Sequence, residues 1–242
     1  MSRFKTTGDK LKEVLKLMDL CKNTIKITFS QNELIFNSMD ASRTSLMNGS
    51  ISYAMFDEYV GDGEEIYIDI KNFDSILKRA KKNTATLTIK GSVIEVTEKN
   101  TTWKVNQLAE GIKPPTPKFE PTNYCTLSAE QFNEEMSRVL DEGDFITLEM
   151  DSQHLKLSCN DDTKKDIIVS NIPLTEFSSQ EYIADVKSSF GSNFFETLMK
   201  DIPKTSKVQL GIGTDYPLLV RIFSDDGLYT VDYYVAPRVE QD

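Results

Sequence analysis

The chain has 242 residues and a net charge of −10, and hydrophobic residues make up 39% of it. This composition is ordinary for a soluble globular protein and excludes disorder along the whole length. No apolar run approaches the roughly eighteen residues of a membrane span, and the N-terminus lacks a signal-peptide core. We therefore expect an intracellular protein.

The first half of the chain carries two helical patterns with strand patterns around them. Apolar residues spaced along one face predict helices over 10–21 and 71–82. Alternation of apolar and polar residues predicts strands at 25–29, 34–36, 84–89 and 93–97. The proline-rich stretch Ala109–Asn123 follows, and it is expected to be an extended linker because proline fits neither a helix interior nor a central strand.

The second half repeats this order. We expect a helix over 129–140 and another that opens at Tyr182–Lys187 and continues to Ile202. Strand patterns lie at 145–148, 155–157, 207–211, 218–223 and 228–235. Matching elements are offset by roughly 115 to 120 residues, which indicates a duplicated architecture. The prediction is an α+β chain of two topologically similar domains, 1–108 and 124–242, joined by the linker 109–123, with sheets covered on one face by a pair of helices.

The helix over 71–82 is unusually basic, with a net charge of +4. At about 100° per residue, Lys71, Lys78 and Lys82 lie opposite its apolar stripe, and the two other basic residues flank them. Its basic side chains, which we call the basic ridge, are Lys71, Lys78, Arg79, Lys81 and Lys82. Such a ridge suits sequence-independent contacts with nucleic-acid phosphates. For this helix alone, solvated lysines near a helix C-terminus are an equally good interpretation.

The other helices are less basic. The further candidates for contact with DNA are Lys10, Lys12 and Lys16 of the first helix, Arg138 of the third, and Lys187 and Lys200 of the fourth. The third helix is acidic, with Arg138 as its single cation. One helix of this charge would bind DNA only weakly, so stable association requires repeated copies of the helix or topological capture.

Four short motifs stand in order along the chain: Ser38–Leu46 (SMDASRTSL), Phe56–Tyr59 (FDEY), Phe73–Arg79 (FDSILKR) and Tyr234–Val239 (YVAPRV). Each resembles a motif of the sliding clamps of the proliferating cell nuclear antigen type, and Tyr216-Pro-Leu is similar to the opening of one of their late strands. The resemblance covers essentially the whole chain, and the length and the Ala-Pro-Arg-Val ending look archaeal.

The resemblance implies a subunit of a closed trimeric ring, with helices lining the hole and sheets outside, through which double-stranded DNA threads without sequence readout. It also implies a processivity factor without catalytic activity or cofactor. A DNA polymerase, an ATP-driven clamp loader and repair enzymes would dock through peptides with aromatic anchors. An acidic exterior around a basic lining would reconcile the net charge with DNA binding. In an archaeal cell the location would be the cytoplasm and nucleoid.

Two further sets of residues match functional positions of that family. The partner-peptide pocket would comprise Met39, Thr44, Leu46, Leu108, Ile112, Pro217, Tyr234, Ala236, Pro237 and Val239. Ring closure would pair the edge strands 101–108 and 164–171, with Trp103, Val105, Ile167 and Val169 at the subunit interface. Core packing and ordinary edge strands are the alternative interpretations of these residues.

The chain departs from the family pattern in its acidic third helix, in Arg43 and in its short, proline-rich linker. The first departure leaves open whether the ring is homotrimeric or built from different subunits, and whether the chain belongs to a checkpoint-type clamp or a protein-only scaffold.

An enzyme is the rival class, because Asp161-Asp162 and Asp225-Asp226 could bind a divalent metal. Both pairs lie at turns, which aspartate stabilises by itself. His154 is expected at the surface and the widely spaced cysteines as free thiols, so no metal site or cofactor is predicted.

Overall fold

The structure is a computed structural model that describes residues 1–21, 24–77, 84–109, 114–115, 117–140, 143–160 and 168–238. It divides into two compact units. Unit 1 is Met1–Pro115 with Ser224–Val231, and unit 2 is Thr116–Phe223 with Asp232–Asp242. The predicted linker 109–123 therefore begins in unit 1 and ends in unit 2, and the predicted domain limits stay a prediction. None of the described helices has the length and apolar character that crossing a bilayer demands.

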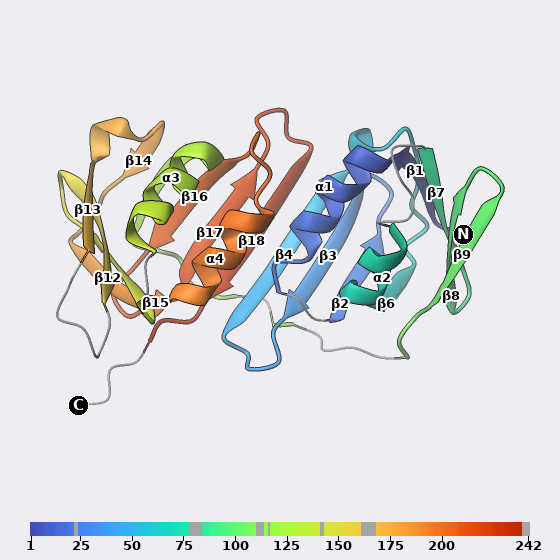
Figure 1. Ribbon diagram of the computed structural model, residues 1–242, viewed down its shortest axis with the longest axis horizontal. Coiled ribbons are helices and arrows are strands. Elements are labelled where there is room, and N and C mark those ends of the chain that lie inside the picture. Colours follow the sequence, from blue (N-terminus) through green and yellow to red (C-terminus); the bar gives the residue numbers. More distant parts are fainter. Residues whose placement is uncertain are drawn as a thin grey trace. The chain divides into compact units, whose positions relative to one another are not determined.

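Unit 1 consists of antiparallel strands and two helices (Figure 1). Its elements are β1 (Arg3–Thr7), α1 (Gly8–Met18), β2 (Thr24–Phe29), β3 (Glu33–Met39), β4 (Ser45–Ser52), the 3₁₀ helix η1 (Tyr53–Met55), β5 (Glu58–Val60), β6 (Glu65–Asp69), α2 (Ile70–Leu77), β7 (Thr84–Lys90), β8 (Val93–Glu98) and β9 (Thr101–Asn106). Hydrogen bonds join the strands in the orders β5-β1-β7-β8-β9 and β4-β3-β2-β6.

Unit 2 follows the same plan. Its elements are β10 (Asn123–Ser128), α3 (Ala129–Val139), β11 (Phe145–Met150), β12 (His154–Asn160), β13 (Ile168–Pro173), η2 (Leu174–Glu176), β14 (Ser179–Glu181), β15 (Val186–Gly191), α4 (Ser192–Asp201), β16 (Lys207–Ile212), β17 (Leu218–Phe223) and β18 (Tyr229–Val235), whose first residues belong to unit 1. The strand orders are β14-β10-β16-β17-β18 and β13-β12-β11-β15.

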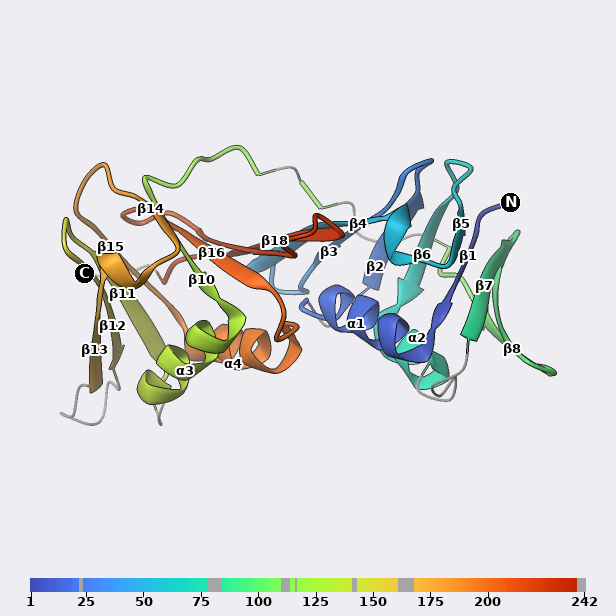
Figure 2. The ribbon, with the colours of Figure 1, turned by 90° about the horizontal axis from the view of Figure 1, so that it is seen from above.

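The two units are topological repeats. Each element of unit 1 has a counterpart at the same place in unit 2, from β1 and β10 to β9 and β18, and the paired strands are joined in the same order. The predicted duplication and the α+β fold class are thereby confirmed. In each unit the two helices lie side by side on one face of the strands, α1 beside α2 and α3 beside α4 (Figure 2).

Side-chain patterning explains this arrangement. Buried and partly exposed residues alternate strictly along β2, as a strand with one face in the core requires. The helices bury one stripe each. Val14, Leu17 and Met18 of α1 are almost fully buried, as are Phe132 and Met136 of α3.

The structure corrects several expected boundaries. The first helix begins at Gly8 and ends at Met18 rather than spanning 10–21. The fourth begins only at Ser192, because the segment expected to open it, Tyr182–Lys187, is a loop that leads into strand β15. Strands β1, β4, β5, β10 and β14 were not predicted. Of the interface segment predicted at 164–171, the described residues are 168–171. They belong to strand β13, Ile168–Pro173.

Candidate functional site

The basic ridge is described only at its first residue. Lys71 is exposed in the first turn of α2, whereas Lys78, Arg79, Lys81 and Lys82 lie outside the described residues. The carboxylate of Asp69 caps α2, because its Oδ1 accepts the amide hydrogens of Lys71 at 2.9 Å and Asn72 at 3.2 Å. Phe73 is almost fully buried under the helix, so α2 is anchored by its apolar side while Lys71 stays in solvent.

Helix α1 adds three lysines. Lys10 lies 3.7 Å from Asp57, and Lys12 lies 3.9 Å from Asp9. Lys16 is exposed. Exposed pairs of this kind contribute little energy, so all three lysines remain available to a polyanion.

Helix α3 is acidic in the structure as in the sequence. Its Glu130, Glu134 and Glu135 outnumber Arg138, which gives a net charge of −2. Arg138 donates hydrogen bonds to Glu134 at 2.5 Å and to Glu135 at 2.7 Å. The positive charge of Arg138 is therefore directed at its own helix.

The fourth helix carries one of its two predicted cations. Lys200 lies in the last turn of α4, 3.8 Å from Glu196. The placement of Lys187 on this helix is wrong, because Lys187 lies on β15 and its Nζ is 2.9 Å from Glu149 on β11. The helix starts only at Ser192, after strand pairing of β15 with β11 has ended at Gly191.

In unit 1, Met39 and Leu46 face each other across β3 and β4 and are 8% and 9% exposed. Asp40 organises the turn between them. It accepts hydrogen bonds from the Thr44 hydroxyl at 2.8 Å, the Ser45 amide at 2.6 Å and the Ser42 hydroxyl. Although burial acts in the opposite direction, these bonds lower the pKa of Asp40. The turn thus fixes three of the residues predicted for the peptide pocket, Met39, Thr44 and Leu46.

In unit 2, Pro217, Tyr234, Ala236 and Pro237 are all partly exposed. The ring of Phe119 stands edge-on to Tyr234 at 5.4 Å and lies 6.3 Å from Tyr216. Sequence reasoning missed Phe119 and Tyr216 as members of this group. Burial, followed by the charge of Asp232, raises the pKa of Tyr234 to about 12, so its phenol is neutral at physiological pH.

Of the remaining predicted pocket residues, Leu108 of unit 1 is 39% exposed. Ile112 and Val239 lie outside the described residues.

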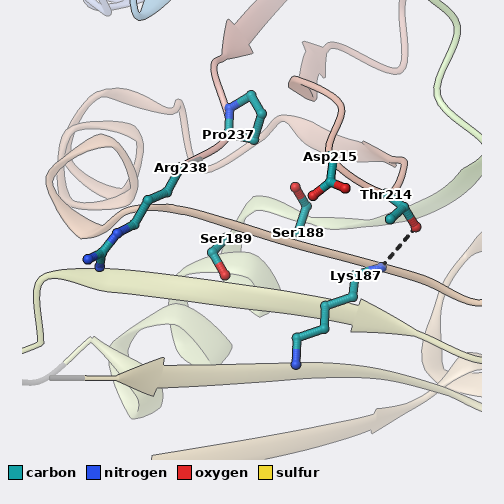
Figure 3. Close-up of a pocket in the computed structure, with 7 residues that line it drawn as sticks. All are labelled: Lys187, Ser188, Ser189, Thr214, Asp215, Pro237 and Arg238. Atoms are coloured by element: carbon teal, nitrogen blue, oxygen red, sulfur yellow. Dashed lines mark hydrogen bonds between the residues drawn. The ribbon is translucent and has the colours of Figure 1, made fainter. Parts of the chain in front are cut away.

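A cavity of about 400 Å³ adjoins Pro237 in unit 2 (Figure 3). Lys187, Ser188 and Thr214 line it, and the Lys187 amide donates to the Thr214 hydroxyl at 3.4 Å. The buried Oγ of Ser188 has no hydrogen-bond partner. Arg238 stands at the rim, with its guanidinium 4.2 Å from the ring centre of Phe145.

Strands β9 and β13 are the end strands of their sheets. On β9, Trp103 is partly exposed and Val105 is 9% exposed. On β13, Val169 is 42% exposed, and Ile167 lies just outside the described residues. Exposed apolar side chains on an unpaired strand edge form a surface suited to strand addition.

Comparisons with known proteins cover the whole chain. A DNA polymerase sliding clamp of Thermococcus gammatolerans is 27% identical over 254 aligned residues, which are 98% of this chain and 99% of the relative. A DNA polymerase sliding clamp of Methanobrevibacter smithii is 24% identical over 100% of this chain and 96% of its own length. No family model matches the chain.

The fold agrees at full length as well. PCNA of A. fulgidus, solved with the C-terminal region of FEN-1 bound, superposes with a TM-score of 0.90 over 100% of both chains at 21% identity. Along its full length the chain is therefore similar, in sequence and in fold, to archaeal DNA polymerase sliding clamps of the PCNA type. A complex of two sliding clamp proteins of Sulfolobus tokodaii, PCNA2 and PCNA3, gives a TM-score of 0.80 at 22% identity, over 98% of this chain and 100% of that one.

The enzyme alternative finds no support in these comparisons. The family consists of processivity factors rather than enzymes. Asp225 and Asp226 lie in the turn before β18, where Asp226 accepts the Leu228 amide at 3.2 Å. His154 is 41% exposed, as the sequence predicts, and Asp161-Asp162 lie outside the described residues. The described residues hold no cluster of three or more candidate metal ligands.

Proposed function

We propose that this chain is one subunit of a trimeric ring that encircles double-stranded DNA and tethers DNA polymerase to its template. The full-length likeness to sliding clamps carries this proposal. The duplicated plan supports it, because two repeats that each place two helices on one face provide a helical lining for a ring. An archaeal cell interior, with the DNA of the nucleoid, is the location that fits the relatives.

The residues proposed to contact DNA are the basic ridge and the lysines of α1 in unit 1, and Lys200 of α4 and Arg138 of α3 in unit 2. Contacts between lysine and phosphate are sequence-blind and sensitive to salt, which permits sliding. Lys187, which lies on a strand and pairs with Glu149, is the weakest member of the predicted set.

The proposed partner site takes short peptides with aromatic anchors. Its candidate residues in unit 2 are Tyr234, Phe119 and Tyr216. Partly exposed aromatic and proline side chains suit such anchors. The A. fulgidus clamp binds the C-terminal region of FEN-1, and we expect polymerase, clamp loader and repair enzymes to use the same kind of peptide here.

A ring of different subunits is the second candidate. The observation that favours it is α3, where Arg138 is engaged by two glutamates and the net charge is −2. A sister subunit with more basic helices would supply the positive charge that α3 lacks. The Sulfolobus tokodaii complex of two different clamp proteins provides a precedent for such pairing.

The DNA face is tested by a variant that combines Lys78→Ala, Arg79→Ala and Lys82→Ala. We expect it to abolish stimulation of a polymerase on primed circular DNA, while light scattering shows an intact ring. The control combines Lys5→Ala, Lys26→Ala and Lys90→Ala, which removes the same charge from strands of unit 1. Unaltered stimulation by the first variant would contradict the assigned face.

The partner site is tested by Tyr234→Ala and Pro237→Ala in titrations with a FEN-1 C-terminal peptide. Both variants should weaken peptide binding and leave loading on DNA unchanged. Tyr53→Ala is the matched control, because Tyr53 is an aromatic residue of unit 1 that is 54% exposed. Equal peptide affinity of all variants would contradict the assignment of Tyr234 and Pro237 to the peptide site.

A further inference from the structure

The segment after β18 is attached to the edge of a sheet in unit 2. Strand β15 is the end strand of that sheet, and the Arg238 amide donates to the Ser189 carbonyl of β15 at 2.7 Å. We call residues 236–238 the tail segment. Pro237, which the proposed peptide site uses, lies between the end of β18 and this hydrogen bond. The position of Pro237 therefore depends on how firmly Arg238 is held.

The side chain of Arg238 reaches one strand further. Figure 3 shows it crossing β15, the strand that carries Ser189. Its guanidinium carbon lies 4.2 Å from the centre of the Phe145 ring, and Phe145 begins β11, the strand next to β15. A guanidinium over an aromatic face is attracted by the negative charge density of the ring. Arg238 thus binds two adjacent strands, β15 through its backbone and β11 through its side chain.

A glycine on β15 leaves this ring accessible. Gly191 pairs with Phe145 across the two strands, and side chains at paired positions stand on the same face of a sheet. The φ angle of Gly191 is −60°, which any residue adopts, so its backbone conformation does not require glycine. The atom nearest to a Cβ placed there would be Oδ1 of Asn193, at 2.7 Å, which is the end of a flexible side chain.

The other repeat has a different residue at this place. The last residue before α2 is Asp69, whose carboxylate caps that helix by accepting two backbone amides. The last residue before α4 is Gly191, and α4 has no side-chain cap. A helix loses stability without such a cap. Unit 2 therefore forgoes a cap at the position whose missing side chain leaves Phe145 open to Arg238.

We propose that Arg238 is a positioning residue for the partner-peptide site. By stacking on Phe145 it holds the tail segment against β15, and it thereby orders Pro237 before a peptide arrives. Arg238 acts through the tail segment and not by contact with the peptide. Ordering in advance favours binding, because the peptide does not have to offset the entropy of fixing the segment. This inference rests on the proposed function, which places the peptide at Tyr234 and Pro237.

The test is a titration with a FEN-1 C-terminal peptide. We expect Arg238→Ala and Phe145→Leu each to weaken binding about fivefold, and Arg238→Lys to weaken it less, because lysine retains the positive charge. The double variant should bind no more weakly than Arg238→Ala alone, since both changes break the same contact. Arg3→Ala is the control, because Arg3 is an arginine of unit 1 that is 50% exposed.

A second measurement needs no peptide. Amide hydrogen exchange over 236–238, read by mass spectrometry on the assembled protein, should be faster in Phe145→Leu than in the unmodified protein. Urea unfolding should change little, because the stacked pair lies at the surface and not in the core. A role confined to stability would instead lower the free energy of unfolding and leave peptide affinity unchanged, which would overturn the proposal.

Two further outcomes are decisive. Unchanged peptide affinity and unchanged exchange in Phe145→Leu would show that the stack does not hold the tail segment, and would also overturn the proposal. Faster exchange in Phe145→Leu, together with failure of the unmodified protein to bind the peptide, would overturn the proposed peptide site and leave Arg238 as the residue that holds the tail segment.

Discussion

Glu135 on α3 accepts a 2.8 Å hydrogen bond from the hydroxyl of Ser170 on β13. The same carboxylate accepts a 2.7 Å bond from Arg138, and Glu135 is only 8% exposed. A buried carboxylate needs such partners, because its desolvation is costly. The Glu135 carboxylate therefore connects helix α3 to the edge strand β13, and it also binds Arg138 of the same helix. In the proposed ring, this arrangement links the DNA-facing helices to the subunit interface.

The exposed glutamates of α3 should shorten the time that a loaded clamp stays on DNA, because they repel its phosphates. The pair of substitutions Glu130→Gln and Glu134→Gln removes two negative charges without disturbing Glu135. We expect the loaded clamp to remain longer on nicked circular DNA, with a steeper dependence of retention on salt. Glu176→Gln with Glu181→Gln, at exposed positions outside α3, is the control. Retention equal to that of the control would show that α3 does not face DNA.

Much of the fold could be predicted from periodicity. Alternation located β2 because that strand buries one face, and helical spacing located α3 to within a residue of its observed end. Strand β15 was missed because two of its residues are serines, Ser188 and Ser189, so the apolar alternation that marks a strand is interrupted. Lys187 was consequently placed on a helix.

The candidate site was less accessible to sequence reasoning. The motif around Tyr234 identified one aromatic side chain, but Phe119 lies in the predicted linker and Tyr216 in the connection between β16 and β17. Their contacts join segments far apart in the chain, and local patterns contain no signal for such contacts. The same holds for the cavity beside Pro237, because its lining comes from β15, from the turn before β17 and from the segment after β18.

The buried cysteines predict a loss of stability at alkaline pH. Burial raises the pKa of Cys21 and Cys125 from 9.0 to about 12. The folded state therefore holds these protons more tightly than the unfolded chain. This contribution to stability is complete below pH 9.0 and declines as the pH rises towards about 12. Urea unfolding should show a falling free energy over that range.

The decline should be smaller in a Cys125→Ala variant when each protein is compared with itself at pH 8. Native protein at pH 8 should also resist a thiol reagent that modifies all three cysteines after unfolding. Fast modification of the native protein would refute the assigned burial of these thiols.

The ion pair of Arg221 and Asp232 should stabilise unit 2. The guanidinium donates two hydrogen bonds, at 2.6 and 2.9 Å, to the two carboxylate oxygens, and this bonding raises the pKa of Arg221. Because both side chains are partly exposed, we expect Asp232→Ala to lower the free energy of unfolding by only about 1–2 kcal/mol. Urea denaturation measures this change.

Two further variants separate the ion pair from its surroundings. Asp232→Asn retains one acceptor and should lose less than Asp232→Ala. The double variant Arg221→Ala with Asp232→Ala should lose less than the sum of the single variants, because each single change leaves one charge without its partner. Strict additivity would mean that the pair contributes nothing.

The edge of β13 should control assembly of the ring. Val169 is 42% exposed, and in the proposed ring it packs against β9 of the next subunit. Val169→Asp places a charge in that apolar contact, so light scattering should show a monomer where the unmodified chain forms a larger assembly. Val60→Asp is the control, because Val60 is 43% exposed on a strand outside the predicted interface.

Trp103 on β9 provides an independent signal, since it is the single tryptophan of the chain. Dilution of the unmodified protein should shift its emission to longer wavelength as subunits separate and the indole meets water. The Val169→Asp variant should show the shifted emission at every concentration. Emission that is independent of concentration in both proteins, together with an unchanged mass for the variant, would place the subunit interface elsewhere.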